Sequence, residues 1–466
     1  LSNLYKNNSF FYKRRYFLLP YLPTIIIKGN IFMTTTCNIF LSVDVGGSQT
    51  KIIYQFSGWN KPNCLLMSPG VEQITKSDLK RYYDQSGWLG APSDEQQAWV
   101  EWKGSIFVVG DFTSEFAAID RIFERKYENA LYKVLAAIGV ILSKHDVKSK
   151  RRKNASSQSI KVNLYLGLLL PWNEYNDRNR FQEQLELMLR SLKFRGQSWN
   201  VNLSAFECRP EGGGLAAIRI KQKGLEWLQE NKVVVLMFGH RNVTAIYFDG
   251  GAIKRGDSPL LGFSTFLDDV CRRVSGLERD KLAASIFETI DYSEHHIYHD
   301  ECTVHPKWEE SKAIATLATA KDETLRKLEK EDIVKAIKLA IPSYWNQIKK
   351  WLDKNIYSMP DEVIIGGGAA VFLEPELEEY FNCKGIKPES HSYRERKIGE
   401  RTNTYYGRDY ITHADLVWVE DIQKRIGNIF SFKWKIKKHQ SIRLIDCFGM
   451  FSQLKDIVTE TENAKN

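Results

Sequence analysis

Asp44 and Lys51 flank a glycine-rich turn, so that one ligand could meet both of their opposite charges. Apolar runs at 39–45 and 51–56 predict two strands joined by this turn, whose residues are Gly46, Gly47, Ser48, Gln49 and Thr50. Glycine permits backbone conformations in which several N–H groups point at one anion, such as a phosphate. Asp44 would hold Mg²⁺ directly or through water, and Lys51 would contact the phosphates. An ordinary β-hairpin is the alternative, because a lone glycine-rich turn is a weak signal.

Two more turns that contain glycine follow apolar runs. Residues 232–238 form a nearly continuous apolar run, typical of a strand buried on both faces. Residues 239–242 then turn the chain into a further apolar run at 243–248. A short predicted strand at 361–365 leads into three glycines, Gly366, Gly367 and Gly368. Because all three turns follow strands, we predict two similar α/β halves whose turns face one nucleotide.

Strands and helices are predicted to alternate along the chain, which is typical of the α/β class. The run at 123–142 is the clearest amphipathic helix, because its apolar residues recur at helical spacing. Further strands are predicted at 160–170 and 199–208, and a hairpin at 97–111. Five other helices are predicted. One ends near 192, one runs from the glycines at 212–214 to 230, two cover 266–290 and 309–353, and the last follows Met450.

The composition is that of a globular protein of several domains. Of the 466 residues, 43% are hydrophobic and 26% are charged, which is enough apolar material for large cores. No apolar run reaches about 18 residues, so no membrane-spanning helix is expected. The seven cysteines are scattered and include no CxxC pair, which favours reduced thiols and a cytoplasmic location.

Basic residues are concentrated at the start of the chain. The formal net charge is +9, and residues 1–32 contribute +5 without any acid, which leaves +4 for the remainder. That remainder is weakly charged for its size, so its charge gives no reason to expect direct binding to nucleic acid. Residues 1–32 have the basic-then-apolar order of a signal peptide, but two prolines interrupt the apolar run and no clear cleavage site follows. We expect a poorly ordered upstream extension, with the natural start at Met33.

The stretch 384–440 is irregular and charged, and we predict an insert there. Within it, residues 416–429 are predicted to be helical, and the basic, aromatic piece 432–438 alternates like an edge strand. That piece would either contact DNA or another subunit, or would simply be an edge strand guarded by lysines. The histidine-rich stretch 294–305 is predicted to be a solvated loop, because its spacing matches no structural zinc site well.

Seven stretches of the sequence resemble the actin, heat-shock chaperone and sugar-kinase superfamily in their order and spacing. More narrowly, the chain resembles the bacterial plasmid-segregation actins of the ParM/StbA type, over about 38–380 and the closing helix near 441–460. No single stretch is diagnostic. The stretches are VDVGGSQTK (43–51), KYENALYKVLAAIG (126–139), LGLLLPWNEYNDRNRF (166–181), RPEGGGLAA (209–217), LMFGHRNVTAIYF (236–248), LGFSTFLDDV (261–270) and IIGGGAAV (364–371).

The resemblance implies an actin-like ATPase fold, in which two duplicated α/β domains face a nucleotide cleft. We expect an extension at 1–37, domain I at 38–210, domain II at 211–383, the insert at 384–440 and a return to domain I at 441–466. The cleft is expected to bind ATP or GTP together with Mg²⁺.

The resemblance also assigns roles on the phosphate side of the cleft. Asp44 matches the aspartate that orients Mg²⁺ and water, so it is both the expected metal residue and a catalytic residue. Lys51 matches the phosphate lysine, and the amides expected to hold the β- and γ-phosphates are those of Gly46, Gly47, Ser48 and Gln49. Glu211 matches the catalytic residue that positions the attacking water. Taken alone, Glu211 would more simply be a carboxylate stabilised at a helix N-terminus.

The other loops follow the family pattern less closely. The loop expected near the base and ribose consists of Gly366, Gly367 and Gly368, although a flexible turn would also explain these residues. In the second phosphate loop Gly239 remains, but Met237 stands where the family has an aspartate, and a thioether is too weak an acceptor to hold Mg²⁺. Arg241 would either replace the metal's charge with a bidentate contact to the phosphates or be a surface turn residue. We therefore expect nucleotide binding with slow or altered hydrolysis.

The function that the resemblance implies is that of a nucleotide-binding filament protein for plasmid or DNA segregation. Head-to-tail contacts between copies would make the filament, and a DNA-binding adaptor would link it to DNA, without direct DNA contact and without a membrane. Activity as an ATP hydrolase is left open. The alternatives are a small-molecule kinase of the same superfamily, a chaperone-type ATPase, and a structural filament that uses nucleotide only as a ligand, which Met237 favours.

Overall fold

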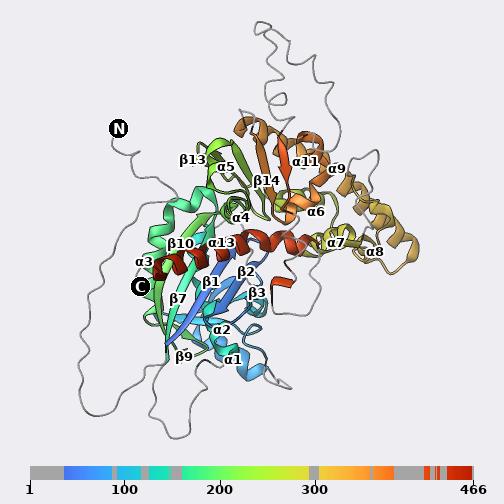
Figure 1. Ribbon diagram of the computed structural model, residues 1–466. Helices are drawn as coiled ribbons and strands as arrows, with labels where there is room; N and C mark the ends of the chain where they lie inside the picture. Colours follow the sequence, from blue (N-terminus) through green and yellow to red (C-terminus); the bar gives the residue numbers. More distant parts are fainter. Residues whose placement is uncertain are drawn as a thin grey trace, which may run out of the picture.

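Two five-stranded sheets form the framework of the protein, seen in a computed structural model (Figure 1). The first sheet has the order β10-β7-β1-β2-β3 and the second has the order β13-β12-β11-β14-β15. The strands of the first are β1 (Thr36–Val45), β2 (Thr50–Phe56), β3 (Asn63–Met67), β7 (Lys161–Leu170) and β10 (Asn200–Pro210). Those of the second are β11 (Val233–Phe238), β12 (Val243–Asp249), β13 (Ala252–Asp257), β14 (Glu362–Gly366) and β15 (Asp415–Val417). The structure describes residues 36–86, 92–116, 125–145, 147, 160–292, 304–356, 360–381, 414–419, 426, 428–430 and 438–463.

Both sheets have the same connectivity. In each, three consecutive strands pair antiparallel, and two later strands are added in parallel on the other side of the first strand. β1 therefore lies between β2 and β7, as β11 lies between β12 and β14. Parallel pairing needs a crossover connection, which α2 (Lys126–Lys144) supplies before β7 and α9 (Glu323–Asn355) supplies before β14. The repeated topology confirms the predicted α/β class and its two similar halves.

A third, antiparallel sheet, which also has five strands but mostly shorter ones, lies against α2. Its order is β4-β6-β5-β8-β9. The hairpin predicted at 97–111 is formed by β5 and β6, and Lys103 and Gly104 make its turn with φ angles of 48° and 82°. The strands are β4 (Val71–Ile74), β5 (Trp99–Trp102), β6 (Ser105–Val109), β8 (Lys193–Phe194) and β9 (Gln197–Ser198).

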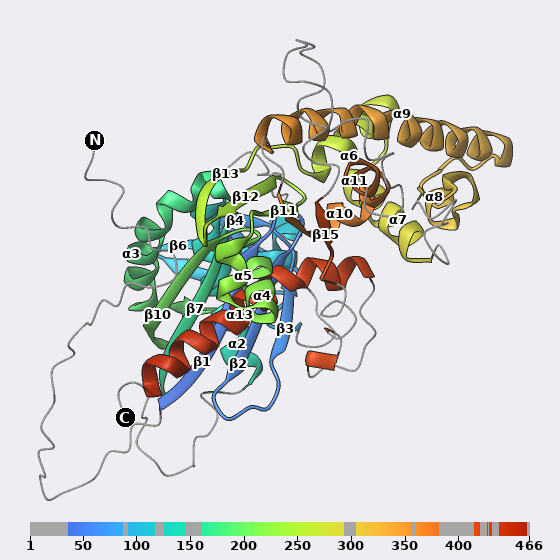
Figure 2. The ribbon, with the colours of Figure 1, turned by 45° about the horizontal axis from the view of Figure 1, so that its top comes forward.

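The remaining elements are helices that cover the sheets. Figure 2 shows that α6, α7, α8 and α9 gather beside the second sheet, at the far end of the molecule from α3. The helices are α1 (Lys76–Gln85), α3 (Arg178–Leu189), α4 (Gly213–Lys223), α5 (Leu225–Glu230), α6 (Phe263–Arg273), α7 (Arg279–Tyr292), α8 (Lys312–Ala315), α10 (Gly368–Phe372), α11 (Glu374–Phe381) and α13 (Lys438–Asn463). Short 3-10 helices are η1 (Gly110–Phe116), η2 (Trp172–Asp177) and η3 (Trp308–Glu310).

α13 joins the two halves. It runs over β1 and β7 and passes beside α4 (Figure 1). Two glycines permit this close crossing: a Cβ atom on Gly214 would lie 1.9 Å from the carbonyl oxygen of Asp446, and one on Gly449 would lie 2.0 Å from that of Gly214. The prediction that the last helix follows Met450 is wrong, because α13 already begins at Lys438. Gly449 serves a helix–helix contact and does not break the helix.

Two other helix predictions are corrected. The helix predicted from 212–214 to 230 is divided into α4 and α5, because Gly224, with a φ of 93°, ends the first. The helix predicted at 416–429 begins instead as β15, in which Leu416 and Val417 pair with β14. The local pattern of apolar residues does not reveal that β14 has a free edge at which such a segment can pair.

Much of the predicted extension and insert lies outside the described residues. The same holds for the predicted edge strand up to residue 437 and for most of the histidine-rich stretch, from which His305 contacts Glu376 over 2.7 Å. The predicted domain boundaries stay predictions. In the ranges that the structure describes, no helix is both long and apolar enough to cross a membrane.

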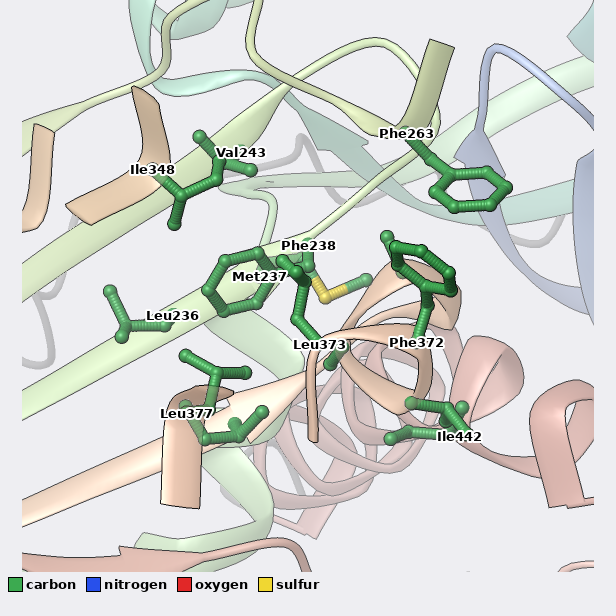
Figure 3. Close-up of a cluster of buried hydrophobic side chains, with 14 of the residues drawn as sticks. Leu236, Met237, Phe238, Val243, Phe263, Ile348, Phe372, Leu373, Leu377 and Ile442 are labelled. Carbon is green, nitrogen blue, oxygen red and sulfur yellow. The ribbon is translucent and has the colours of Figure 1, made fainter. Parts of the chain in front are cut away.

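Each half has its own apolar core. One cluster surrounds β1, β7 and α2, and the other surrounds β11, β14, α6 and α9. In Figure 3 the side chains of Met237 and Phe238 on β11 lie close to Phe372, which ends α10, and to the following Leu373, in the second core. Because both cores are close-packed, the strands hold the turns at their ends in defined positions.

Gly449→Ala is predicted to destabilise the protein, because the added methyl would meet backbone atoms of Gly214 that cannot move unless α13 and α4 separate. We expect the free energy of unfolding to fall by about 1–3 kcal/mol, the usual cost of overpacking. Ser452→Ala, one turn further along α13, is the control and is expected to change it by less than about 0.5 kcal/mol. Urea unfolding measures both. A gain at Gly449, as for an ordinary helical glycine, would contradict the tight crossing.

Candidate functional site

A cleft of about 420 Å³ lies where the two halves meet. This volume is in the range of small-molecule sites. Its walls come from the β1–β2 turn, the end of β10, the turn after β11 and the start of α10, together with α7 and α13. The strand ends of both halves thus meet at one place. The predicted site residues that line the cleft are Asp44, Gly46, Gly47, Ser48, Gln49, Lys51, Glu211, Gly239, Gly367 and Gly368.

Asp44 and Lys51 form an ion pair at the base of the first turn. They are cross-strand partners in β1 and β2, and only 2% of Asp44 and 7% of Lys51 is exposed. Burial of two charges is tolerated because each compensates the other. Gly46 lies against the pair: a Cβ atom there would lie 2.5 Å from the carbonyl oxygen of Gln49 and 3.3 Å from Lys51 Nζ. The turn therefore requires glycine at position 46.

Arg443 of α13 reaches the same turn from the other end of the chain. Its Nη2 donates a hydrogen bond to Ser48 Oγ over 3.0 Å. Burial lowers the pKa of Arg443 from its ordinary value, and the nearby Asp44 acts in the opposite direction. Arg443 thus adds a second cationic group beside the turn that carries Lys51.

Glu211 lies between the two halves, directly after β10. Its Oε1 is 2.5 Å from Nζ of Lys126, at the start of α2, and its backbone N–H donates to the carbonyl oxygen of Leu170 over 2.7 Å. Thr244 of β12 donates a long hydrogen bond of 3.5 Å to Oε2. Only 5% of Glu211 is exposed, and its side chain lines the cleft. Elements of both halves therefore hold one carboxylate that a bound ligand or water can reach.

Asp446 of α13 caps the start of α4. Its Oδ2 accepts a hydrogen bond from the N–H of Gly212 over 2.7 Å, and its Oδ1 accepts from those of Gly214 and Leu215 over 2.8 and 3.2 Å. Burial raises the pKa of Asp446 to about 7, the charge of Asp44 acts in the same direction, and the N–H groups act against both. Because Gly212 directly follows the carboxylate of the cleft, the cap also positions that carboxylate.

Arg241 and Gly366 do not line the cleft. Arg241 is only 9% exposed, and its Nη2 lies 3.2 Å from Glu174 Oε1. It is therefore not a surface turn residue. It also does not contact the cleft in this structure, where its charge is paired with the buried carboxylate of Glu174. Gly366 ends β14, and a Cβ atom there would lie 2.4 Å from the side chain of Leu215. Packing against α4 accounts for this glycine.

Met237 belongs to both the cleft wall and the second core. Its side chain is 5% exposed and lies among the apolar residues of Figure 3. The position at which the family pattern has an aspartate is thus apolar. Among the residues that the structure describes, no three or more His, Cys, Asp or Glu side chains are grouped so as to hold a metal ion.

Several residues that line the cleft were not predicted from the sequence. Those of α7 share one helical face, and their helical spacing is the signal that could have identified them. They are Asp280, Ala283, Ala284, Phe287 and Glu288. Lys126 stands at the first position of a stretch quoted for the resemblance, but no pattern gave it a role. The others are His240, Phe263 and Ala369, which lie in stretches quoted for the resemblance without a role of their own, and Gln440 and Arg443 of α13.

Asp446 predicts how stability depends on pH. The folded chain holds the Asp446 proton up to about pH 7, far above the ordinary carboxyl pKa of 3.8. The stability that this proton contributes is therefore complete below about pH 4 and is lost as the pH rises through 7. Asp446→Asn cannot titrate, so its melting temperature should fall less between pH 5 and pH 8 than that of the wild type. Asp456→Asn, an exposed change on the same helix, is the control. Equal slopes in wild type and Asp446→Asn would contradict this assignment.

The arrangement of the chain is similar to that of solved actin-like proteins. The actin-like protein Alp7A is 15% identical, with 92% of this chain and 99% of that chain covered and a TM-score of 0.53. The archaeal actin homologue Ta0583 and the apo psk41 ParM protein are 13% and 11% identical, with TM-scores of 0.45 and 0.43. The matches to Ta0583 and to the psk41 protein cover 90% and 91% of this chain, respectively, and 99% of each of those two chains. No family model matches the sequence, and no curated protein matches it. The chain therefore has the actin-like fold that its sequence motifs predicted.

Proposed function

We propose that the chain binds a nucleoside triphosphate in the cleft and assembles with copies of itself into filaments that segregate plasmid or other DNA. The observation that carries this proposal is the convergence of glycine turns from both halves on the ion pair of Asp44 and Lys51. Such turns present backbone N–H groups, which bind anions well at strand ends. A cleft that contacts one ligand from two halves also lets that ligand set the angle between them.

The phosphates would lie against the β1–β2 turn. The N–H groups of that turn and the ammonium of Lys51 would bind the β- and γ-phosphates, and Gly239 would approach them from the second half. The base and ribose would lie toward Gly367, Gly368 and the lining face of α7. There the ring of Phe287 offers an apolar surface to a base. ATP and GTP both fit this description, and the base contacts alone would distinguish them.

Glu211 would act on water in hydrolysis. A carboxylate in this position can orient a water molecule for in-line attack on the γ-phosphorus and can accept its proton. Lys126 already contacts one oxygen of Glu211, which leaves the other oxygen with the long contact to Thr244. We infer that hydrolysis is slow, because no second carboxylate assists at the apolar position of Met237.

The proposal of a filament and of its partners is supported by the resemblance of the sequence motifs. Identical copies that contact head to tail form an open filament when the contact does not close. An adaptor protein would hold the DNA, and the assembly would work in the cytoplasm. A second candidate is a filament that uses nucleotide only as a ligand and does not hydrolyse it, which the apolar Met237 favours.

Glu211→Gln tests the proposed chemistry. It keeps the shape of the side chain but removes the carboxylate, so phosphate release from ATP should fall at least about tenfold, while the Kd for ATP changes less than about threefold. Glu207→Gln, on β10 just before Glu211 and outside the cleft lining, is the control and should behave as wild type. A release rate that is indifferent to Glu211 would contradict its role.

Light scattering with ATP, ADP and GTP tests filament formation. Scattering that no nucleotide changes would contradict nucleotide control of assembly.

A further inference from the structure

Lysine side chains pair with the carboxylates at the phosphate side of the cleft. Lys51 pairs with Asp44, and Lys126 pairs with Glu211. Lys51, Lys126 and Glu211 have side chains that are less than a tenth exposed. Burying ammonium groups is unfavourable unless each has a partner of opposite charge. The carboxylates therefore allow these ammonium groups to be buried in the empty cleft, where a phosphate-binding role would explain their position.

A third lysine lies on the same face of α2, two turns after Lys126. Lys133 is 8% exposed. Burial lowers the pKa of Lys133 to about 8, the charges of Lys126 and Arg241 act in the same direction, and Asp44 acts against them. Lys126 lines the cleft, whereas Lys133 does not. The start of α2 thus brings the positive charge of Lys126 to the side at which the phosphates are proposed to bind.

The same residues fit a divalent cation poorly. Mg²⁺ prefers hard oxygen ligands and is usually held by one or two carboxylates in addition to the substrate phosphates. Here Asp44 and Glu211 are each in contact with an ammonium group. At the position where the family has a further aspartate, this chain has the thioether of Met237. A dication at this place would be repelled by both ammonium groups, and sulfur does not compensate for a missing oxygen ligand. The expectation that Asp44 holds Mg²⁺ is therefore not supported by the donors around it.

We propose that the ammonium groups of Lys51 and Lys126 neutralise the bound phosphates in this cleft, so that nucleotide binds without a divalent cation. The proposal rests on the nucleotide binding proposed above and adds that the protein itself supplies the positive charge. Arg443, which contacts Ser48 in the same turn, adds to that charge. Lys126 is thus a binding residue for phosphate and the partner of Glu211 when the cleft is empty.

Calorimetric titration of the full chain with ATP, in Mg²⁺ and then in EDTA, tests this proposal. We expect the two Kd values to agree within about threefold. A Kd that rises more than about tenfold in EDTA would overturn the proposal while leaving nucleotide binding intact. An absence of heat in both buffers would instead contradict the proposed nucleotide binding, so the two failures are distinguishable.

Lys126→Met tests the lysine itself, because it removes the ammonium group and keeps an apolar side chain of similar length. We expect its Kd for ATP in EDTA to rise at least about tenfold. Lys144→Met is the matched control on the same helix: Lys144 is exposed, pairs with Glu95 outside the cleft, and should leave the Kd unchanged. Thermal unfolding of both variants verifies that they are folded.

The double change Lys126→Met and Glu211→Gln separates two explanations of such a loss. If the loss came only from the unpaired Glu211 repelling the phosphates, the double variant would bind as tightly as wild type, and the proposal would be overturned. If the ammonium itself binds the phosphates, the double variant stays at least about tenfold weaker than wild type in EDTA. Lys126→Arg, which restores a positive charge, should recover most of the affinity.

Discussion

The contact between the Asp446 carboxylate and the first N–H groups of α4 is the interaction on which the geometry of the cleft depends. It joins the last helix of the chain to the segment that follows β10, and it lies directly beside Glu211. The close approach of Gly214 and Gly449 makes this contact possible, because any larger side chain would push the helices apart. The position of the catalytic candidate thus depends on residues more than two hundred positions further along the chain.

On the phosphate side of the cleft, the two carboxylates are each paired with an ammonium group. Asp44 with Lys51, and Glu211 with Lys126, each bury one ammonium beside one carboxylate. Arg241 of the second turn follows the same rule, because it pairs with Glu174 of the first half. Such pairing allows charged side chains to be buried in the empty cleft, and it leaves cations that an anionic ligand can recruit. This electrostatic pattern suits phosphates better than it suits a metal ion.

Local sequence patterns predicted most of the strands and their turns. The two apolar runs around the turn at 46–50 and the nearly continuous run at 232–238 became β1, β2 and β11. Gly367 and Gly368, which glycine spacing singled out, line the cleft. That spacing was misleading at Gly449, where a glycine that supports a helix crossing resembles one that ends a helix. Leu416 and Val417 were also misjudged, because a strand at a sheet edge depends on the partner strand and not on its own periodicity.

The sequence by itself determined the actin-like α/β arrangement and the turns at the strand ends, because these depend on backbone conformation and local apolar patterns. Only the tertiary structure decided which charged side chains meet in the cleft. Lys126 and Arg443 reach it from helices whose local sequence gave neither residue a role, and the charge of Arg241 is paired with the buried carboxylate of Glu174. Electrostatic pairs form between residues distant in sequence, so their partners are known only when the packing of the two halves brings them together.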